Sequence, residues 1–410
     1  MTTTKNNEHK KLNFPSEREQ SQACLNSAEH EKNQGRKVLN VPNLRFPEFE
    51  GEWEKCKLGD KCDLLCGYAF DGKNIVEQGT YLLMRGINIT EGIIRHSSEL
   101  DRYYTGSVNN LAKYKLTTGD LVIGMDGSKV GRNSAIVSLT ENGSYLVQRV
   151  CRIKSCIGND FLLQLVNNHK FHKYVDMVKT SSAIPHISLK DIQNFPIAVP
   201  SIQKEADKIS KLFHLLDERI ATQNKIIDKL QSLIKGIAQK IVRNNMPNVR
   251  LTECLECKSS TLQESEVCEQ GTYPVYGANG IVGYLDNYNT EGEAVYIIKD
   301  GSGVGTVSYV TGKCSATGTL NTLQAKEGYS LQYFYYLLKV FNFEPYKTGM
   351  AIPHIYFKDY GKAKVFCPSY TEQLQYARLL SAIDNKLSIE QNILTELSLQ
   401  KQYLLRQMFI

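Results

Sequence analysis

The sequence predicts an α+β protein in which two mixed α/β domains stand in tandem and each is followed by a long α-helix. Three features lead to this expectation: an internal repeat, a heptad pattern that closes each copy, and a succession of short apolar runs and turn residues before each heptad pattern. The chain has 410 residues, of which 41% are hydrophobic, so it can bury the cores of two or three domains.

The repeat consists of four short matches that occur in the same order in both halves of the chain. Residues 121–131 and 295–305 both carry an apolar run, then Asp-Gly-Ser and a Val-Gly pair. Residues 183–187 and 351–355 both read Ala-Ile-Pro-His-Ile. The last two matches pair Lys190-Asp191 with Lys358-Asp359, and Pro200-Ser201 with Pro368-Ser369. The repeat indicates two near-equivalent modules around a pseudo-twofold axis.

Each copy ends in a stretch where apolar residues recur at steps of four and three, which is the heptad signature of a coiled coil. We expect long helices at residues 201–245 and 369–410, each about 60 Å long at 1.5 Å per residue. The apolar residues predicted to form the seam between the helices are Phe213, Leu216, Ile220, Ile227, Leu230, Ile237, Leu380, Ile383, Leu387, Leu394, Leu397 and Leu404.

Three polar residues, Gln223, Glu390 and Lys401, interrupt the apolar series. Polar residues at seam positions can fix which register two helices adopt. If the helices pair in antiparallel fashion, opposite charges could meet at these positions.

Residues 39–200 and 246–368 are predicted to form the two mixed α/β domains, since short runs of Thr, Tyr and β-branched residues alternate there with turn signals. Residues 300–305 read Asp-Gly-Ser-Gly-Val-Gly between two such runs, as a hairpin turn does. In a phosphate-binding glycine loop a helix follows the glycines, whereas here a strand-like run follows. We interpret the loop as a tight turn, which could also lie against DNA.

Residues 1–38 are polar and mixed in charge, and we expect them to be a disordered extension. The chain has no run of about 18 apolar residues, and its first residues lack the apolar core of a signal peptide, so we expect a cytoplasmic protein. The eleven cysteines are then expected to be free thiols. Cys254 and Cys257 form a C-x-x-C pair without the second pair of a zinc site, and no metal site is predicted.

The formal net charge of +6 suits a nucleic-acid partner without demanding one. Tyrosines outnumber phenylalanines by 23 to 14, and many lie among basic and amide residues in the two domains. Such side chains can contact phosphates and base edges, although each could equally be an ordinary surface residue. The candidate DNA-contacting residues are Arg85, Asn88, Arg102, Tyr103, Lys129, Arg132, Tyr276, Asn279, Lys299 and Ser302.

No catalytic residue is predicted. His186 and His354 recur in the repeat without a nucleophile that recurs beside them, which favours a turn fixed by the preceding proline. The chain contains no Asn-Pro-Pro-Tyr/Phe motif of amino-methyltransferases and no Walker A sequence.

Residues 45–53 read Arg-Phe-Pro-Glu-Phe-Glu-Gly-Glu-Trp. Together with the tandem repeat of domain and helix, this stretch resembles the specificity subunits of type I restriction–modification systems. The resemblance covers roughly residues 41–410, and the long N-terminal extension departs from the family pattern.

The resemblance implies that each domain is a target-recognition domain that reads one half of an asymmetric, gapped DNA site. It also implies that the two helices pack antiparallel as a spacer and dock two methyltransferase subunits. S-adenosylmethionine, ATP and Mg²⁺ would then belong to the methyltransferase and motor–nuclease subunits, and this chain would bind no cofactor.

Two other classes of protein remain as alternatives. One is a coiled-coil scaffold with two ligand-binding domains and no DNA role. The other is a self-contained nuclease or methyltransferase, against which the missing motifs argue.

Overall fold

The computed structural model describes residues 39–349 and 352–410, so the disorder predicted for residues 1–38 lies outside the described residues. The chain divides into two compact units. The first unit runs up to Lys211 and includes Leu404–Ile410, and the second unit is Leu212–Tyr403. This division falls within both long helices.

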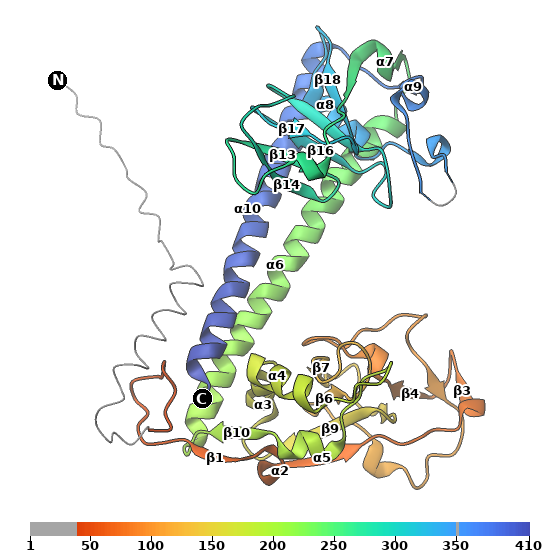
Figure 1. Ribbon diagram of the computed structural model, residues 1–410. Coiled ribbons are helices and arrows are strands. Elements are labelled where there is room, and N and C mark those ends of the chain that lie inside the picture. Colours follow the sequence, from red (N-terminus) through yellow and green to blue (C-terminus); the bar gives the residue numbers. More distant parts are fainter. Residues whose placement is uncertain (1–38, 350–351) are drawn as a thin grey trace, which may run out of the picture. The chain divides into compact units, whose positions relative to one another are not determined.

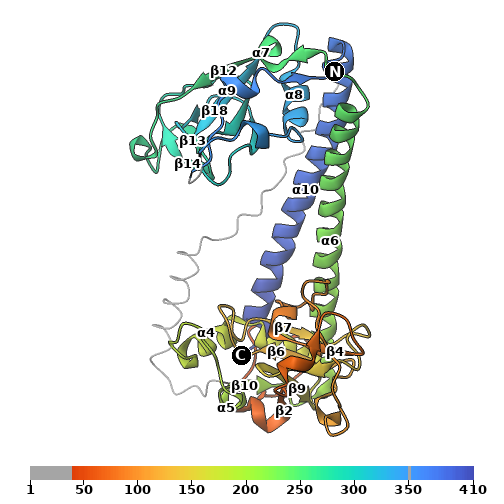
Figure 2. The same ribbon diagram turned by 90° about the vertical axis from the view of Figure 1, so that its right-hand side faces the viewer.

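The two long helices are α6, Gln203–Arg243, and α10, Tyr370–Met408. They lie side by side in both ribbon views (Figures 1 and 2). Within the second unit Asp217 pairs with Lys401, and Gln223 pairs with Glu390, so the helices run antiparallel. Seam residues of both helices join one buried cluster, with Ile227, Ile234, Ile241, Leu380 and Leu387 all buried.

The first unit contains a four-stranded antiparallel sheet of order β2-β9-β6-β7 and a second sheet of order β3-β5-β4-β8. The strand pair β1–β10 lies where the domain meets α6. The strands are β1 (Glu54–Lys57), β2 (Cys62–Cys66), β3 (Ile75–Val76), β4 (Tyr81–Met84), β5 (Tyr103–Tyr104), β6 (Leu121–Gly124), β7 (Ser134–Ile136), β8 (Tyr145–Leu146), β9 (Val150–Ser155) and β10 (Pro196–Val199). The helices are α2 (Leu58–Lys61), α3 (Asn159–Val166), α4 (His169–Val178) and α5 (Leu189–Asn194).

The second unit repeats this topology, with a four-stranded antiparallel sheet of order β12-β18-β15-β16 and a smaller sheet of order β14-β13-β17. A short pair, β11–β19, corresponds to β1–β10. The strands are β11 (Val249–Arg250), β12 (Leu255–Ser259), β13 (Tyr273–Gly277), β14 (Gly280–Leu285), β15 (Ala294–Ile298), β16 (Val307–Val310), β17 (Ser315–Ala316), β18 (Leu320–Ala325) and β19 (Lys364–Val365). The helices are α7 (Leu251–Cys254), α8 (Leu331–Leu338) and α9 (Phe357–Tyr360).

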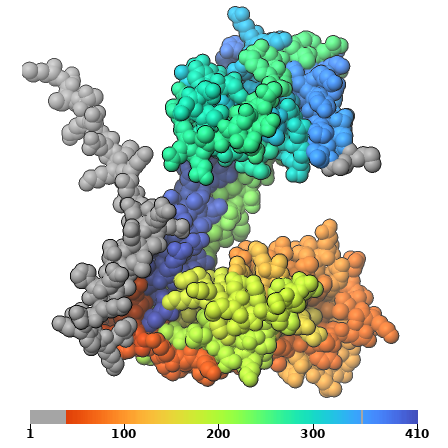
Figure 3. Space-filling model, viewed as in Figure 1, coloured from red at the N-terminus to blue at the C-terminus, as the bar shows by residue number. Residues whose placement is uncertain are grey.

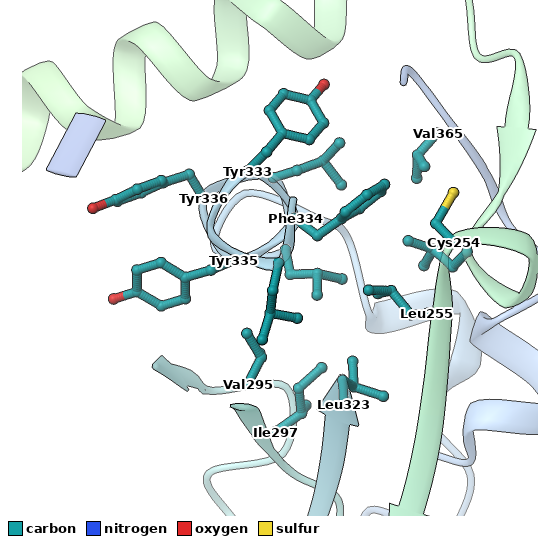
Figure 4. Packing of buried hydrophobic residues seen from close by; sticks show 14 of the residues in the cluster. Cys254, Leu255, Val295, Ile297, Leu323, Tyr333, Phe334, Tyr335, Tyr336 and Val365 are labelled. Carbon is teal, nitrogen blue, oxygen red and sulfur yellow. The ribbon is translucent and has the colours of Figure 1, made fainter. Parts of the chain in front are cut away.

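Helix α8 carries four aromatic residues in a row, Tyr333 to Tyr336, and all four are buried. Figure 4 shows Phe334 pointing toward Cys254 and Leu255, with residues of β15 and β18 below the helix. Because this cluster also contains the seam residues of α6 and α10, the core of the second domain continues into the helix seam.

The end of α10 completes the core of the first unit. Phe409 is 3% exposed, and its ring centroid lies 5.2 Å from that of Phe161 and 6.3 Å from that of Trp53. The amide of Asn168 donates to the carbonyl of Leu405 at 2.9 Å. The C-terminal residues of the chain therefore belong to the first domain.

The stretch at residues 45–53 also has a structural role. Arg45 makes two hydrogen bonds to the carboxylate of Glu205, in the first turn of α6, at 2.7 and 2.8 Å. The indole nitrogen of Trp53 donates to the same carboxylate at 3.2 Å. Glu205 is fully buried, so this stretch ties the start of α6 to the first domain.

Candidate nucleic-acid interface

The two repeated motifs contact each other in both units. The Asp-Gly-Ser loop connects β6 to β7 in the first unit and β15 to β16 in the second. The amide nitrogen of Gly127 donates to the carbonyl of Pro185 at 3.0 Å, and that of Gly301 donates to Pro353 at 3.0 Å. In each unit the Ile-Pro-His-Ile loop thus holds the glycine loop in place through this hydrogen bond.

Both glycine loops need glycine after the aspartate. Gly127 has a φ of 91° and Gly301 a φ of 92°, in the left-handed region that other residues rarely adopt. The turn interpretation of this motif is confirmed, since a strand precedes and follows each loop.

The repeated histidines stabilise these loops through hydrogen bonds. The backbone of Thr180 donates to the carbonyl of His186 at 3.0 Å, and Thr348 donates likewise to His354 at 2.9 Å. The imidazole of His186 lies 3.0 Å from the hydroxyl of Thr180, whereas that of His354 lies 2.6 Å from the carboxylate of Asp300. The histidines thus close a turn in each unit.

Three candidate residues of the first unit lie in or beside the β3-β5-β4-β8 sheet. Arg85 follows β4 and is half-buried, and Tyr103 is half-buried in β5. The guanidinium of Arg102 donates to the carbonyl of Asp101 at 2.7 Å and to that of Glu99 at 3.1 Å. Arg102 therefore uses part of its hydrogen-bonding capacity within its own loop.

Asn88 differs from the other candidates because it is only 1% exposed. Its amide donates to the carbonyl of Arg95 at 3.2 Å and to the carboxylate of Asp101 at 3.0 Å. These bonds hold residues 88–101 together, and a base edge could not reach the amide without breaking them.

Lys129 and Arg132 lie on the glycine loop of the first unit, with solvent-accessible charges. Lys129 pairs with Glu91 at 3.1 Å, and Arg132 pairs with Asp176 at 2.7 Å. Exposed ion pairs of this kind contribute little stability, so both cations can exchange their carboxylates for phosphates.

In the second unit three of the four candidates lie on the glycine loop or on the neighbouring strand β13. Lys299 and Ser302 lie on the same glycine loop, where Ser302 is exposed. The backbone of Lys299 donates to Thr319, and that of Thr317 donates to Tyr276, which places Tyr276 on a neighbouring segment. Tyr276 is half-buried against Tyr296, and burial raises the pKa of its hydroxyl. Asn279 is exposed in the turn between β13 and β14. The region around this turn, in teal, forms much of the face of the second unit that is visible in Figure 3.

Cys254 of the C-x-x-C pair is buried and Cys257 is half-buried. Burial raises the pKa of Cys254 to about 12 and that of Cys257 to about 11. Among the described residues no group of three or more His, Cys, Asp or Glu side chains could hold a metal ion. Every helix of residues 39–349 and 352–410 is too short or too polar to cross a membrane.

Sequence reasoning missed two features of this surface. It did not foresee that the two repeated motifs touch, because their contact joins residues far apart in the chain. It also missed Thr180 and Thr348, although they recur at the same spacing as the Ile-Pro-His-Ile motif and close the same turn.

The family model of the type I restriction modification DNA specificity domain matches residues 50–232 and 244–399. The chain belongs to this family. Each matched range contains one domain and most of the helix that follows it, so the specificity domain is present twice.

Relatives agree with this membership. The EcoAI type I specificity subunit of Escherichia coli is 31% identical over 186 residues, 44% of this chain and 30% of that subunit. The match thus spans about a third of the EcoAI subunit's length. A protein named as a type I specificity subunit in Mycoplasma genitalium is 22% identical over 388 residues, 87% of this chain and 94% of that protein.

A solved structure supports the fold. The crystal structure of a type I restriction–modification system S subunit from M. genitalium superposes with a TM-score of 0.64 at 18% identity. It covers 90% of this chain and 99% of the other.

Proposed function

We propose that this chain is the DNA-recognition subunit of a type I restriction–modification complex, reading a bipartite, asymmetric site. The observation that carries the proposal is that both units present a glycine loop from the same topology, bonded to an identical Ile-Pro-His-Ile loop, with different side chains on the glycine loop. Lys129 and Arg132 of the first unit stand where the second has Gly303 and Thr306. Equivalent surfaces with different side chains suit two half-sites of different sequence.

The antiparallel helices would act as a coiled-coil spacer between the two target-recognition domains. A pair of long helices is stiff, whereas a flexible linker would let the distance between two readers vary. A spacer of this kind would set a constant gap between the half-sites, as half-site spacing in other two-headed DNA readers follows from protein geometry.

A second stripe of apolar residues on α6, apart from the seam, supports the docking of partner subunits. Leu215, Ile226 and Leu233 are exposed by 53%, 37% and 48%. Their spacings of eleven and seven residues are close to whole turns of an α-helix, so the three side chains share one face. We assign this face to the methyltransferase subunits, which would supply S-adenosylmethionine and the methylation chemistry.

The proposal is tested with the purified chain and a methyltransferase subunit encoded with it. The chain alone should bind duplex DNA with an affinity that falls steeply as salt rises, because phosphate contacts release counterions. Adenine methylation should require the added subunit. Methylation by the chain alone, or a lack of salt-sensitive DNA binding as for a scaffold protein, would contradict the proposal.

A further inference from the structure

Each unit exposes one large apolar side chain at an equivalent place in the repeat. Ile184 in the first unit is 66% exposed, and Ile352 in the second is 58% exposed. Both precede the proline and histidine of the Ile-Pro-His-Ile loop, whose final isoleucine, Ile187 or Ile355, is buried. The same short motif therefore buries one isoleucine and exposes the other.

Hydrogen bonds fix the backbone at and after these isoleucines. In the first unit the hydroxyl of Ser182 donates to the carbonyl of Ile184 at 2.7 Å. The next carbonyl along the chain, that of Pro185, accepts from Gly127 at 3.0 Å, and Pro353 accepts likewise from Gly301. The exposed position is thus anchored to the glycine loop in both units.

The repetition of this exposed side chain contrasts with the loops beside it. Lys129 and Arg132 on the glycine loop of the first unit have no charged counterpart in the second. A surface that reads two different half-sites must differ between the units, whereas a surface that binds two copies of one protein must be the same in both.

The chemistry of isoleucine also favours a protein over DNA as the occupant. An aliphatic side chain cannot bind a phosphate, and phosphate is the feature that both half-sites share. An apolar side chain on a hydrogen-bonded loop can insert into a pocket of a protein partner, where it becomes fully desolvated.

We propose that Ile184 and Ile352 are two equivalent docking points, each inserted into an apolar pocket on one copy of the methyltransferase subunit. This inference rests on the proposed function and adds a contact outside the spacer helices. It places a partner contact directly beside each DNA-reading loop, where a subunit that modifies the half-site must come close.

The test uses the full chain with Ile184→Ser, Ile352→Ser or both, and the methyltransferase subunit as the probe. Burial of an isoleucine corresponds to ~10-fold to 100-fold in affinity, so each single variant should bind one copy more weakly by that factor. Native mass spectrometry should show two copies on the wild type, mostly one on each single variant and few on the double variant. Ile184→Val should retain most of the affinity.

The control variants are Leu139→Ser and Ile281→Ser, which change isoleucine-sized side chains exposed by 83% and 53% outside the repeated motifs. Both should bind the methyltransferase subunit as the wild type does, and DNA binding by each variant chain alone should be unchanged. Normal binding of the methyltransferase subunit by the double variant would overturn the inference. A loss of DNA affinity in the isoleucine variants would also overturn it, because it would assign the isoleucines to DNA. A wild-type chain that binds no methyltransferase subunit would instead contradict the proposed function itself.

Discussion

At the scale of single residues, the carboxylate of Glu205 is where the N-terminal stretch meets the first long helix. It is fully buried and accepts hydrogen bonds from Arg45 and Trp53. Removing one partner of a buried ion pair leaves the other charge uncompensated, which is far costlier than losing a pair in water. The same contacts keep the guanidinium charged, since hydrogen bonding to Glu205 raises the pKa of Arg45.

We expect Glu205→Ala to lower the free energy of unfolding of the first unit by ~3 kcal/mol. Trp53 is the only tryptophan of the chain, so its fluorescence in a urea titration reports on this unit. The control is Glu54→Ala, whose exposed carboxylate pairs with Lys61, and it should change the midpoint little. Equal midpoints for Glu205→Ala and the wild type would refute the role assigned to this cluster.

His96 provides a residue whose contribution depends on pH. Its ring nitrogens lie 3.0 Å from Asp101 and 2.9 Å from Glu141. Burial alone would lower the pKa of His96, but the hydrogen bonds to Glu141 and Asp101 outweigh it and raise the pKa above the ordinary 6.5. A histidine with a raised pKa stabilises the fold fully below its unfolded value, and this contribution disappears as the pH rises through the folded value.

The first unit should therefore lose stability between about pH 6 and pH 8, where histidine titrates. In His96→Gln this part of the pH dependence should vanish, because glutamine carries no titrating proton. Urea midpoints measured by Trp53 fluorescence across this range provide the comparison. Parallel pH profiles for the two proteins would show that His96 does not contribute in this way.

Among the helices and strands, the last turn of α10 and Phe409, which follows it, belong to the first unit. Phe409 packs against Phe161 and Trp53, and truncation of a buried phenylalanine to alanine removes both its apolar burial and its packing. We expect Phe409→Ala to cost ~3–5 kcal/mol in the first unit. Tyr403→Ala, at a position that is 59% exposed near the same helix end, serves as the control and should have a small effect.

The seam of the long helices contains a buried polar pair at equivalent positions of the repeat. The amide of Gln223 donates to the backbone carbonyl of Glu390 at 2.9 Å and also to its carboxylate, which in addition pairs with Lys386. The hydrogen bonds from Lys386 and Gln223 lower the pKa of Glu390, so the carboxylate stays charged inside the seam.

We expect Glu390→Leu alone to lower the thermal midpoint, since it leaves the amide of Gln223 buried without its carboxylate partner. The double variant Gln223→Leu/Glu390→Leu should recover that loss, because an apolar pair can replace a buried polar pair without cost. Differential scanning calorimetry of the two variants decides the matter. A double variant less stable than the single one would mean that these residues stabilise the seam by another route.

At the scale of the whole molecule, the sequence predicted the long helices well and the loop contacts poorly. The heptad pattern placed the helices at residues 201–245 and 369–410, and the structure has them at Gln203–Arg243 and Tyr370–Met408. A heptad series depends on neighbours three and four residues away, so local sequence determines it. The contact of Gly127 with Pro185 joins distant residues, and only the packed domain reveals it.

The candidate site residues also divide into those that the sequence predicts and those whose environment only the packed domain reveals. Residue type indicates Lys129, Asn279 and Ser302 as candidates, and all three are exposed on loops. Residue type indicates Asn88 as well, yet its amide is buried and bonded within the domain. Residue type indicates what a side chain can bind, but burial decides whether it can, and burial of a polar residue in an irregular loop has no periodic signal in the sequence.

We propose that one chain reads two half-sites separated by a constant distance. The most direct test of this proposal is to express the chain with its methyltransferase subunit and to map every methylated adenine in the host genome. We predict a single asymmetric motif of two different half-sites separated by a gap of constant length and unspecified sequence. A continuous palindromic motif would contradict it.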